Sequence, residues 1–119
     1  MLITVYYHER HATDAAQDTF TAVASVSTAA PHVLDALEEA FKATQNIEGS
    51  WSRGRFYEDG TPNRDFSEAV TVLAPLPTHL GRTYGHRSSM TGDIFRVGAE
   101  WFVCRTIGFE PIDVPANLA

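Results

Sequence analysis

The residues best suited to chemistry in this chain stand close together near its C-terminal end, in the stretch 86–93. Arg87 can clamp a carboxylate or a phosphate group with two parallel N–H donors. Gly92 permits a backbone geometry that other residues avoid, and Asp93 can accept N–H bonds where the following strand begins. Ser88 can form local bonds of the same kind. The alternative is that Arg87 pairs with Asp93 or another acidic residue and only holds the loop.

Histidines are the next candidates for acid–base or metal chemistry. His8 and His11 stand three residues apart with Glu9 between them, but a metal site needs a third ligand. His79 and His86 flank a proline-rich segment, and either could act as a general base near neutral pH. No nucleophile is identifiable beside them. We therefore expect no metal site and no cofactor.

Cys104 is the single cysteine, which excludes a disulfide within the chain and a multi-cysteine zinc site. It could be drawn into a triad with His86 and Asp93, but it falls inside a predicted strand, where a nucleophile is poorly exposed. The chain also lacks a P-loop and a G-x-G-x-x-G motif. We predict that the protein is not an enzyme. A small hydrolase or metal-dependent enzyme using His79, His86 and Asp93 is the least favoured hypothesis.

A third group combines cations with aromatic rings. Three arginines alternate with three aromatic residues here: Arg53, Arg55 and Arg64 with Trp51, Phe56 and Tyr57. Such an arrangement can neutralise and stack on single-stranded nucleic acid. Alternatively, the arginines stack on the neighbouring rings within a surface loop. The formal net charge of −6 weakens the first possibility, because nucleic-acid binding depends on cationic side chains.

Composition indicates a folded chain with its own core, since 44% of the 119 residues are hydrophobic and 11% are aromatic. A chain of this length is typical of one domain, so we expect a single domain over residues 1–119. No apolar run approaches the ~20 residues of a membrane span. The N-terminal segment becomes charged too early for a signal peptide. These features predict a soluble cytoplasmic protein that does not bind membranes.

Two strands are expected near the start of the chain. Residues 2–7 are β-branched and aromatic, which favours a strand, and the polar stretch 8–18 predicts a loop. Residues 19–27 alternate, which favours a second strand antiparallel to the first. This alternation places four side chains on one face: Phe20, Ala22, Ala24 and Val26.

A helix is expected to begin at Pro31, which suits a first helical turn, and to end near residues 44–46. Its apolar residues repeat at helical spacing and form one stripe: Val33, Leu34, Leu37, Ala40 and Phe41. The middle of the chain is less regular. We expect one further strand at residues 68–73 and an ordered loop at residues 74–86, which contain two prolines and two glycines.

The C-terminal third predicts a β-hairpin. Residues 93–97 and 100–106 read as strands, and Gly98-Ala99 can form a two-residue turn. We expect Phe95, Trp101 and Phe102 to lie in these paired strands beneath the helix. The predicted fold class is therefore α+β: a small antiparallel, partly curled sheet of four to six strands with one main helix packed on it.

The C-terminal motif resembles that of YodL-like proteins, which are small uncharacterised proteins of bacteria, phages and plasmids. Their motif, Arg-Ser-x-Ser-Val-Gly-Asp, precedes an apolar strand, a short turn, an aromatic strand and a Gly-Phe/Trp-Glu segment. The matching positions here are Arg87, Ser88, Gly92, Asp93, Trp101, Gly108, Phe109 and Glu110. Met90 stands where those proteins usually have Ser, and Thr91 where they usually have Val. An earlier stretch, Leu37–Trp51, resembles their helix end and nearby tryptophan.

The resemblance implies an accessory protein of a phage or mobile element. We expect a non-enzymatic protein that acts by protein–protein contact, one version being an inhibitor of a host defence or housekeeping protein. The alternative is a nucleic-acid-binding accessory domain that uses five arginines: Arg53, Arg55, Arg64, Arg82 and Arg87. The candidate binding residues are Arg87, Ser88, Asp93, Trp51, Arg53 and Arg55.

Overall fold

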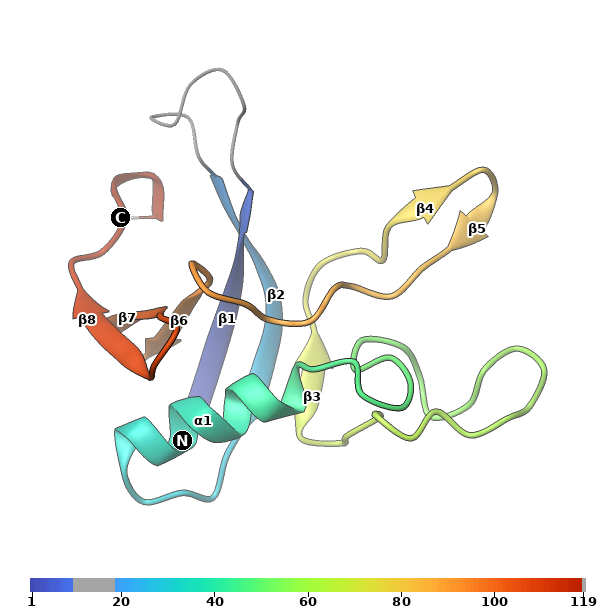
Figure 1. The fold of residues 1–119 in the computed structure, drawn as a ribbon, viewed down its shortest axis with the longest axis horizontal. Helices are drawn as coiled ribbons and strands as arrows, with labels where there is room; N and C mark the ends of the chain where they lie inside the picture. Colours follow the sequence, from blue (N-terminus) through green and yellow to red (C-terminus); the bar gives the residue numbers. More distant parts are fainter. Residues whose placement is uncertain (10–18, 119) are drawn as a thin grey trace.

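The computed structural model describes residues 1–9 and 19–118, which form a six-stranded antiparallel sheet, one α-helix and a separate two-stranded hairpin (Figure 1). The order of strands in the large sheet is β3-β2-β1-β6-β7-β8. Strand β1 (Leu2–Glu9) pairs with β6 (Ile94–Val97), so the N-terminal strand lies beside the C-terminal hairpin in the middle of the sheet. Residues 8 and 9 of the predicted loop 8–18 belong to β1, so that prediction is wrong for them. The rest of the predicted loop, including His11, lies outside the described residues.

Strand β2 (Thr19–Ser27) pairs antiparallel with β1, as predicted, but the pairing contains a β-bulge. Val23 is the extra residue, because it has no partner on β1. A slip of one residue moves the side chains that follow to the other face of the sheet. The predicted single face is therefore wrong: Phe20 lies opposite His8 and shares its face, whereas Ala24 lies on the face of Val5.

Helix α1 (Val33–Ala43) covers one face of the sheet (Figure 1). Leu37 and Ala40 of the predicted stripe are buried in the core, together with Ala36. Leu34, which the helical spacing also placed on the stripe, is 59% exposed. The apolar face of α1 is therefore rotated slightly from the predicted one, because the register of packing on the sheet decides which neighbours are covered.

The ends of α1 are determined by different interactions. The helix follows its N-cap residue His32, so Pro31 precedes the helix instead of lying in its first turn. At the other end the Thr44 hydroxyl donates to the carbonyls of Ala40 and Phe41 at 2.9 and 3.2 Å. Such bonds satisfy carbonyls that have no partner within the helix. They also hold the Thr44 hydroxyl 2.6 Å from that of Ser89.

The predicted C-terminal hairpin is confirmed. Strand β7 (Glu100–Cys104) pairs antiparallel with β6 across the Gly98-Ala99 turn, and Gly98 adopts a φ of 58°. Strand β7 ends at Cys104 instead of residue 106. A separate strand, β8 (Phe109–Ile112), then pairs with it from the other side. The chain turns back here at Gly108, which has a φ of 72°.

The aromatic rings of this hairpin divide between the two faces of the sheet. Phe95 and Phe102 lie opposite each other in the register and belong to the core beneath α1. Trp101 is in a paired strand, as expected, but its side chain points to the opposite face. Its ring lies 5.3 Å from that of Tyr6. The predicted position beneath the helix is therefore correct for the two phenylalanines and wrong for Trp101.

The region after α1 forms two segments that project from the sheet (Figure 1). We call residues 46–68 the loop arm and residues 74–86 the hairpin arm. Between them lies the short edge strand β3 (Val70–Val72), which falls within the strand predicted at 68–73. The hairpin arm contains two paired strands, β4 (Thr78–His79) and β5 (Arg82–Thr83), where only an ordered loop was expected.

The α+β architecture with one main helix on an antiparallel sheet agrees with the predicted fold class. The sheet is open, with β3 and β8 at its edges, and the expected curl stays a prediction. Within the described residues, no helix has the length and apolar character needed to cross a membrane.

Candidate functional site

The carboxylate of Asp93 is the centre of the motif that the sequence singled out. This side chain is fully buried, and Arg87 binds it with both terminal nitrogens, at 2.7 Å to Oδ2 and 2.8 Å to Oδ1. The backbone N–H groups of His8 and Met90 donate to the same two oxygens at 2.9 and 2.8 Å. Four donors therefore occupy the carboxylate, so it has little capacity left for an external ligand.

Arg87 is held on several sides. Its guanidinium carbon lies 4.0 Å from the centre of the Tyr7 ring, a cation–π contact. Its nitrogens also donate to the carbonyls of Ser88 and His8 at 3.0 and 3.3 Å. The hydrogen bonds to Asp93 raise the pKa of Arg87. The sequence left two roles open for Arg87: binding an external anion, or pairing with an acidic residue of the same chain. The structure contains the second, the pair with Asp93.

A line of buried hydroxyl groups connects this ion pair to the end of α1. The Tyr7 hydroxyl donates to the Arg87 carbonyl at 2.7 Å and lies 3.2 Å from the Ser89 hydroxyl, which donates to it. The Ser89 and Thr44 hydroxyl oxygens are 2.6 Å apart. Burial is the main cause that raises the pKa of Tyr7 to about 12. These groups form one network that joins β1, α1 and the start of β6.

Further bonds tie the segment after α1 to the same point. The Ser88 hydroxyl accepts the backbone N–H of Asn46 at 2.8 Å, and the Gln45 amide donates to the Ser89 carbonyl at 3.0 Å. The indole N–H of Trp51 donates to the Arg87 carbonyl at 2.8 Å. We call this whole assembly the latch, and its members are Tyr7, Thr44, Trp51, Arg87, Ser88, Ser89 and Asp93.

The latch changes the interpretation of three candidate binding residues. Trp51 is buried in the core, so its ring cannot stack on an incoming base as the sequence suggested. Ser88 and Asp93 have their oxygens engaged by backbone N–H groups of the protein itself. These side chains hold the elements together, and their positions favour a structural role over a binding one.

Two polar side chains organise the loop arm. One carboxylate oxygen of Asp65 accepts three consecutive backbone N–H groups, from residues 47, 48 and 49, at 2.6 to 2.9 Å. The Asn63 side chain accepts from the backbone of Ser50 at 2.9 Å and donates to the carbonyls of Ser50 and Gly54 at 2.7 and 2.9 Å. No local sequence pattern marks either residue, because the backbone groups they bind lie 9 to 18 positions away.

Two of the three arginines of the loop arm, Arg53 and Arg55, stack on rings, which was the alternative to nucleic-acid binding. Arg55 lies 4.7 Å from the ring centre of Phe66 and is paired with Glu68. Arg53 lies 5.6 Å from the ring centre of Tyr57 and donates to the Thr83 carbonyl at 3.2 Å. Arg53 therefore joins the loop arm to the hairpin arm.

A cleft of about 540 Å³ lies between the two arms. Its lining includes two tyrosines and two arginines: Tyr57, Tyr84, Arg53 and Arg82. The base of the hairpin arm is anchored to the rest of the protein, since the His86 backbone donates to the Ser52 hydroxyl at 2.7 Å and the His86 ring stacks on Trp51 at 5.8 Å. The cleft is thus framed by segments with fixed bases.

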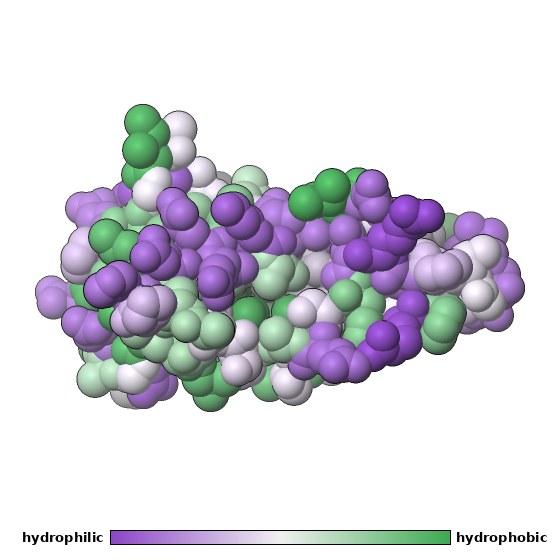
Figure 2. All heavy atoms as spheres, turned by 90° about the horizontal axis from the view of Figure 1, so that it is seen from below, coloured by the Kyte–Doolittle hydropathy of each residue, from purple (hydrophilic) through white to green (hydrophobic). Residues whose placement is uncertain are grey.

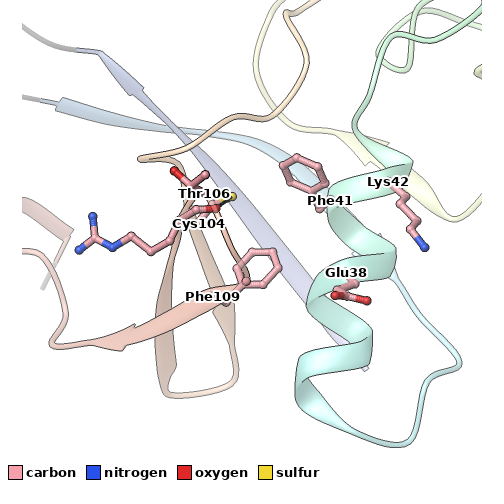
Figure 3. Close-up of a pocket in the computed structure, with 8 residues that line it drawn as sticks. Glu38, Phe41, Lys42, Cys104, Thr106 and Phe109 are labelled. Atoms are coloured by element: carbon pink, nitrogen blue, oxygen red, sulfur yellow. Dashed lines mark hydrogen bonds between the residues drawn. The ribbon is translucent and has the colours of Figure 1, made fainter.

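A second, smaller hollow of about 320 Å³ lies between α1 and the β7–β8 turn (Figure 3). Phe41 of α1 and Phe109 of β8 point into the space between these elements and meet edge to face, with ring centres 6.5 Å apart. Cys104 lies at its floor and is buried, and burial raises the pKa of its thiol. A raised pKa keeps the thiol protonated, which makes it a poor nucleophile.

The triad of Cys104, His86 and Asp93, which the sequence analysis considered and disfavoured, is not assembled through Asp93. The Asp93 carboxylate binds Arg87 and accepts no hydrogen bond from His86, whose ring instead contacts the Ala74 carbonyl at 3.1 Å. His79 lies exposed in the hairpin arm. Among residues 1–9 and 19–118, no group of three or more histidine, cysteine, aspartate or glutamate side chains could hold a metal ion.

Comparisons of the chain with protein-family models, with curated proteins and with solved structures found no match. The resemblance of the C-terminal motif to YodL-like proteins therefore stays a prediction.

Proposed function

We propose that this protein is non-enzymatic and acts by binding another protein through its two arms. The observation that carries the proposal is the cleft between the arms, where tyrosine and arginine side chains are gathered: Tyr57, Tyr84, Arg53 and Arg82. Tyrosine and arginine are enriched at the energetic centres of protein–protein interfaces. Arg53 is already held between the Tyr57 ring and the Thr83 carbonyl, which lowers the entropy that binding would cost.

The edges of the sheet favour contact through side chains over the addition of a strand. Edge strand β8 contains Pro111, which has no N–H group to offer to a partner strand. The other edge strand, β3, has three residues. Short edges and proline are devices that discourage pairing between sheets. A partner would therefore meet the projecting arms and not the ladder of backbone groups.

The surface character of the arms agrees with a partner that is itself polar. Figure 2 shows the molecule from below, with mainly hydrophilic residues at the right-hand end, where the arms project. Hydrophobic groups are more numerous over the body formed by the sheet and α1. Interfaces that form and dissociate are about as polar as the rest of a protein surface, so this distribution supports a reversible complex.

One version of this function is an inhibitor of a host defence or housekeeping protein, encoded by a phage or mobile element. It is supported by the small size and acidic charge of the chain and by the motif at Arg87–Asp93. The alternative is a nucleic-acid-binding accessory domain. It is less favoured, because Arg55 and Arg87 already have carboxylate partners and the formal net charge is −6.

A pull-down can separate these two functions. The tagged full-length chain is incubated with the soluble fraction of a bacterial lysate, with and without nuclease, and bound proteins are identified by mass spectrometry. We expect one predominant protein partner whose recovery does not change with nuclease treatment. Recovery that disappears with nuclease would favour the nucleic-acid alternative. Recovery of no partner in either condition would count against protein binding.

A further inference from the structure

The turn of the hairpin arm contains a leucine where the backbone favours asparagine or glycine. The turn has two residues, Leu80 and Gly81, with φ values of 52° and 77°. Positive φ at both positions defines the type I′ hairpin turn, for which Asn-Gly is the preferred pair. A bulky residue rarely adopts this left-handed region, because its Cβ approaches the following carbonyl oxygen. Within the described residues, Leu80 is the one non-glycine residue with a positive φ.

The strain at Leu80 is not offset by burial of its side chain. Its side chain is 89% exposed, and every residue of β4 and β5 is exposed as well. The hairpin therefore adds no apolar side chain to the core. A strained backbone and an exposed large apolar side chain at one position are two unfavourable features with no structural benefit. Backbone strain of this kind is characteristic of positions that serve a function.

The base of the hairpin arm holds this leucine in a fixed place. The Tyr84 N–H donates to the Pro77 carbonyl at 2.8 Å, which closes the base of the hairpin. Arg53 binds the Thr83 carbonyl from the loop arm. Gly85 packs so closely against Ser50 that a Cβ there would collide with the serine hydroxyl. Because these contacts already order the base of the hairpin arm, binding through Leu80 would not carry the entropy cost of ordering it.

The charge around Leu80 indicates what kind of surface it meets. Residues 74–86 contain no aspartate or glutamate, although the whole chain has a formal net charge of −6. Two acidic residues of the loop arm, Glu58 and Asp59, line the same cleft as Arg82. Glu58 pairs with Arg53 at 3.6 Å. Arg82 lies opposite His79 in the register, immediately beside the turn. Within the part of the chain that the structure describes, the Arg82 side chain forms no ion pair. An unpaired cation next to an apolar tip fits an apolar pocket with carboxylates at its rim.

We infer that Leu80 inserts into an apolar pocket of a protein partner, and that acidic groups at the rim of that pocket face Arg82. This inference rests on the proposed protein-binding function and places the centre of the contact at the tip of the hairpin arm. A lipid bilayer is a less suitable target, since one leucine buries far less apolar surface than even a single acyl chain, whose attachment is only marginal.

The decisive variant is Leu80→Asn, because asparagine fits the type I′ turn better than leucine while removing the apolar tip. We expect its melting temperature to rise by about 3 °C. Its affinity for the partner is expected to fall at least about tenfold, as for a central interface residue. Leu80→Met keeps the apolar character and is expected to keep most of the affinity. Ile107→Asn is the matched control, since Ile107 is 93% exposed in the β7–β8 turn, away from the arms.

The measurement uses the partner recovered from the bacterial lysate, purified and titrated by calorimetry against each variant. The inference is supported when Leu80→Asn binds at least about tenfold more weakly and Ile107→Asn binds within about twofold of the original chain. Equal binding by Leu80→Asn overturns the inference and leaves protein binding intact. Recovery of no partner by the original chain overturns protein binding and this inference with it.

A second experiment tests the bilayer directly with vesicles of phosphatidylcholine and phosphatidylglycerol. We expect the original chain to stay in the supernatant when the vesicles are sedimented. Sedimentation that is lost in Leu80→Asn but retained in Ile107→Asn would show that the leucine inserts into lipid, which overturns the protein pocket. Charge reversal by Arg82→Glu is expected to slow association with the protein partner, because the rim carboxylates would then repel the arm.

Discussion

The latch and the hairpin arm differ in how completely the fold uses their side chains. In the latch, the four donors around Asp93 and the hydroxyl line from Tyr7 to Thr44 leave the buried polar groups satisfied. In the hairpin arm, Leu80 and Arg82 are exposed, and Arg82 forms no ion pair within the described residues. The motif at Arg87–Asp93, whose residue types suggested ligand binding, therefore stabilises the fold. The hairpin arm, which has no such motif, exposes side chains that can contact another molecule.

A polar motif can bind an external ligand, or it can stabilise the fold of its own chain. Arg87, Ser88 and Asp93 have the types and spacing of a ligand-binding loop, yet their ligands are groups of the same chain. A buried carboxylate that lost these donors would be strongly destabilising. Substitution in the latch should therefore change stability, and substitution in the arm should change binding.

The largest effect is expected from Asp93→Ala. This change leaves the Arg87 guanidinium without its carboxylate and the N–H groups of His8 and Met90 without their acceptor. Breaking a buried pair is strongly destabilising, and Arg87 is partly exposed, so we expect a loss of about 3 kcal/mol in the free energy of unfolding. Urea denaturation followed by circular dichroism measures it.

The matched control for this prediction is Glu110→Ala. Glu110 pairs with Arg105 at 2.7 Å, but both side chains are more than half exposed. Surface pairs contribute little, so the expected loss is under about 1 kcal/mol. If Asp93→Ala and Glu110→Ala lowered the free energy of unfolding equally, the latch would stabilise the protein no more than an exposed ion pair does.

A smaller effect is expected from Tyr7→Phe, and it depends on pH. Burial raises the pKa of Tyr7 from 10.0 to about 12, so the neutral hydroxyl is favoured in the folded state. Its contribution to stability is complete below pH 10 and is lost as the pH rises towards 12, because the unfolded tyrosine ionises first. The contribution lost over this interval is about 2 kcal/mol.

The measurement compares the urea stability of the original chain and of Tyr7→Phe at several pH values from 8 to 12. The free energy of unfolding of the original chain should decline more steeply above pH 10, so that the two chains approach each other. Parallel curves would show that Tyr7 ionises in the folded state as readily as a free tyrosine, and that its burial in the latch is not maintained in solution.

The smallest effect on stability, and the one opposite in sign, is expected from Leu80→Asn. Relief of the left-handed leucine should increase the free energy of unfolding by about 0.5 to 1 kcal/mol. The same urea titration measures it beside Gly81→Ala, which introduces a Cβ at a positive φ and should be destabilising. A loss of stability in Leu80→Asn would remove the strain from which the binding role was inferred.

The features that the sequence predicted correctly are those determined by neighbouring residues. The β6–β7 hairpin follows from alternation and from glycine at a two-residue turn. The Arg87–Asp93 pair was one of two roles considered, and its members are six residues apart. The helix was also found, because its apolar spacing is a local pattern. In each case the chain carries the signal within a short window.

The features that the sequence did not reveal depend on pairing between distant segments. The bulge at Val23 exists only in relation to β1, so alternation along β2 could not show it. Trp51 is buried by packing in the core, and its indole N–H donates to a carbonyl 36 residues later. A loop was expected in place of the hairpin of β4 and β5 because residues 74–86 contain two prolines and two glycines, and Leu80-Gly81 lacks the asparagine typical of its turn. That local mismatch is also what marks the hairpin arm as a candidate contact.

Native-state hydrogen exchange, followed residue by residue by NMR, tests the difference between latch and arm most directly. The backbone N–H groups of His8 and Met90 bind the Asp93 carboxylate, whereas that of Tyr84 closes the base of the exposed hairpin. We predict that His8 and Met90 exchange only when the whole protein unfolds, and that Tyr84 exchanges at least about a hundredfold faster through local opening. Exchange of His8 and Met90 as fast as Tyr84 would contradict the structural role assigned to the latch.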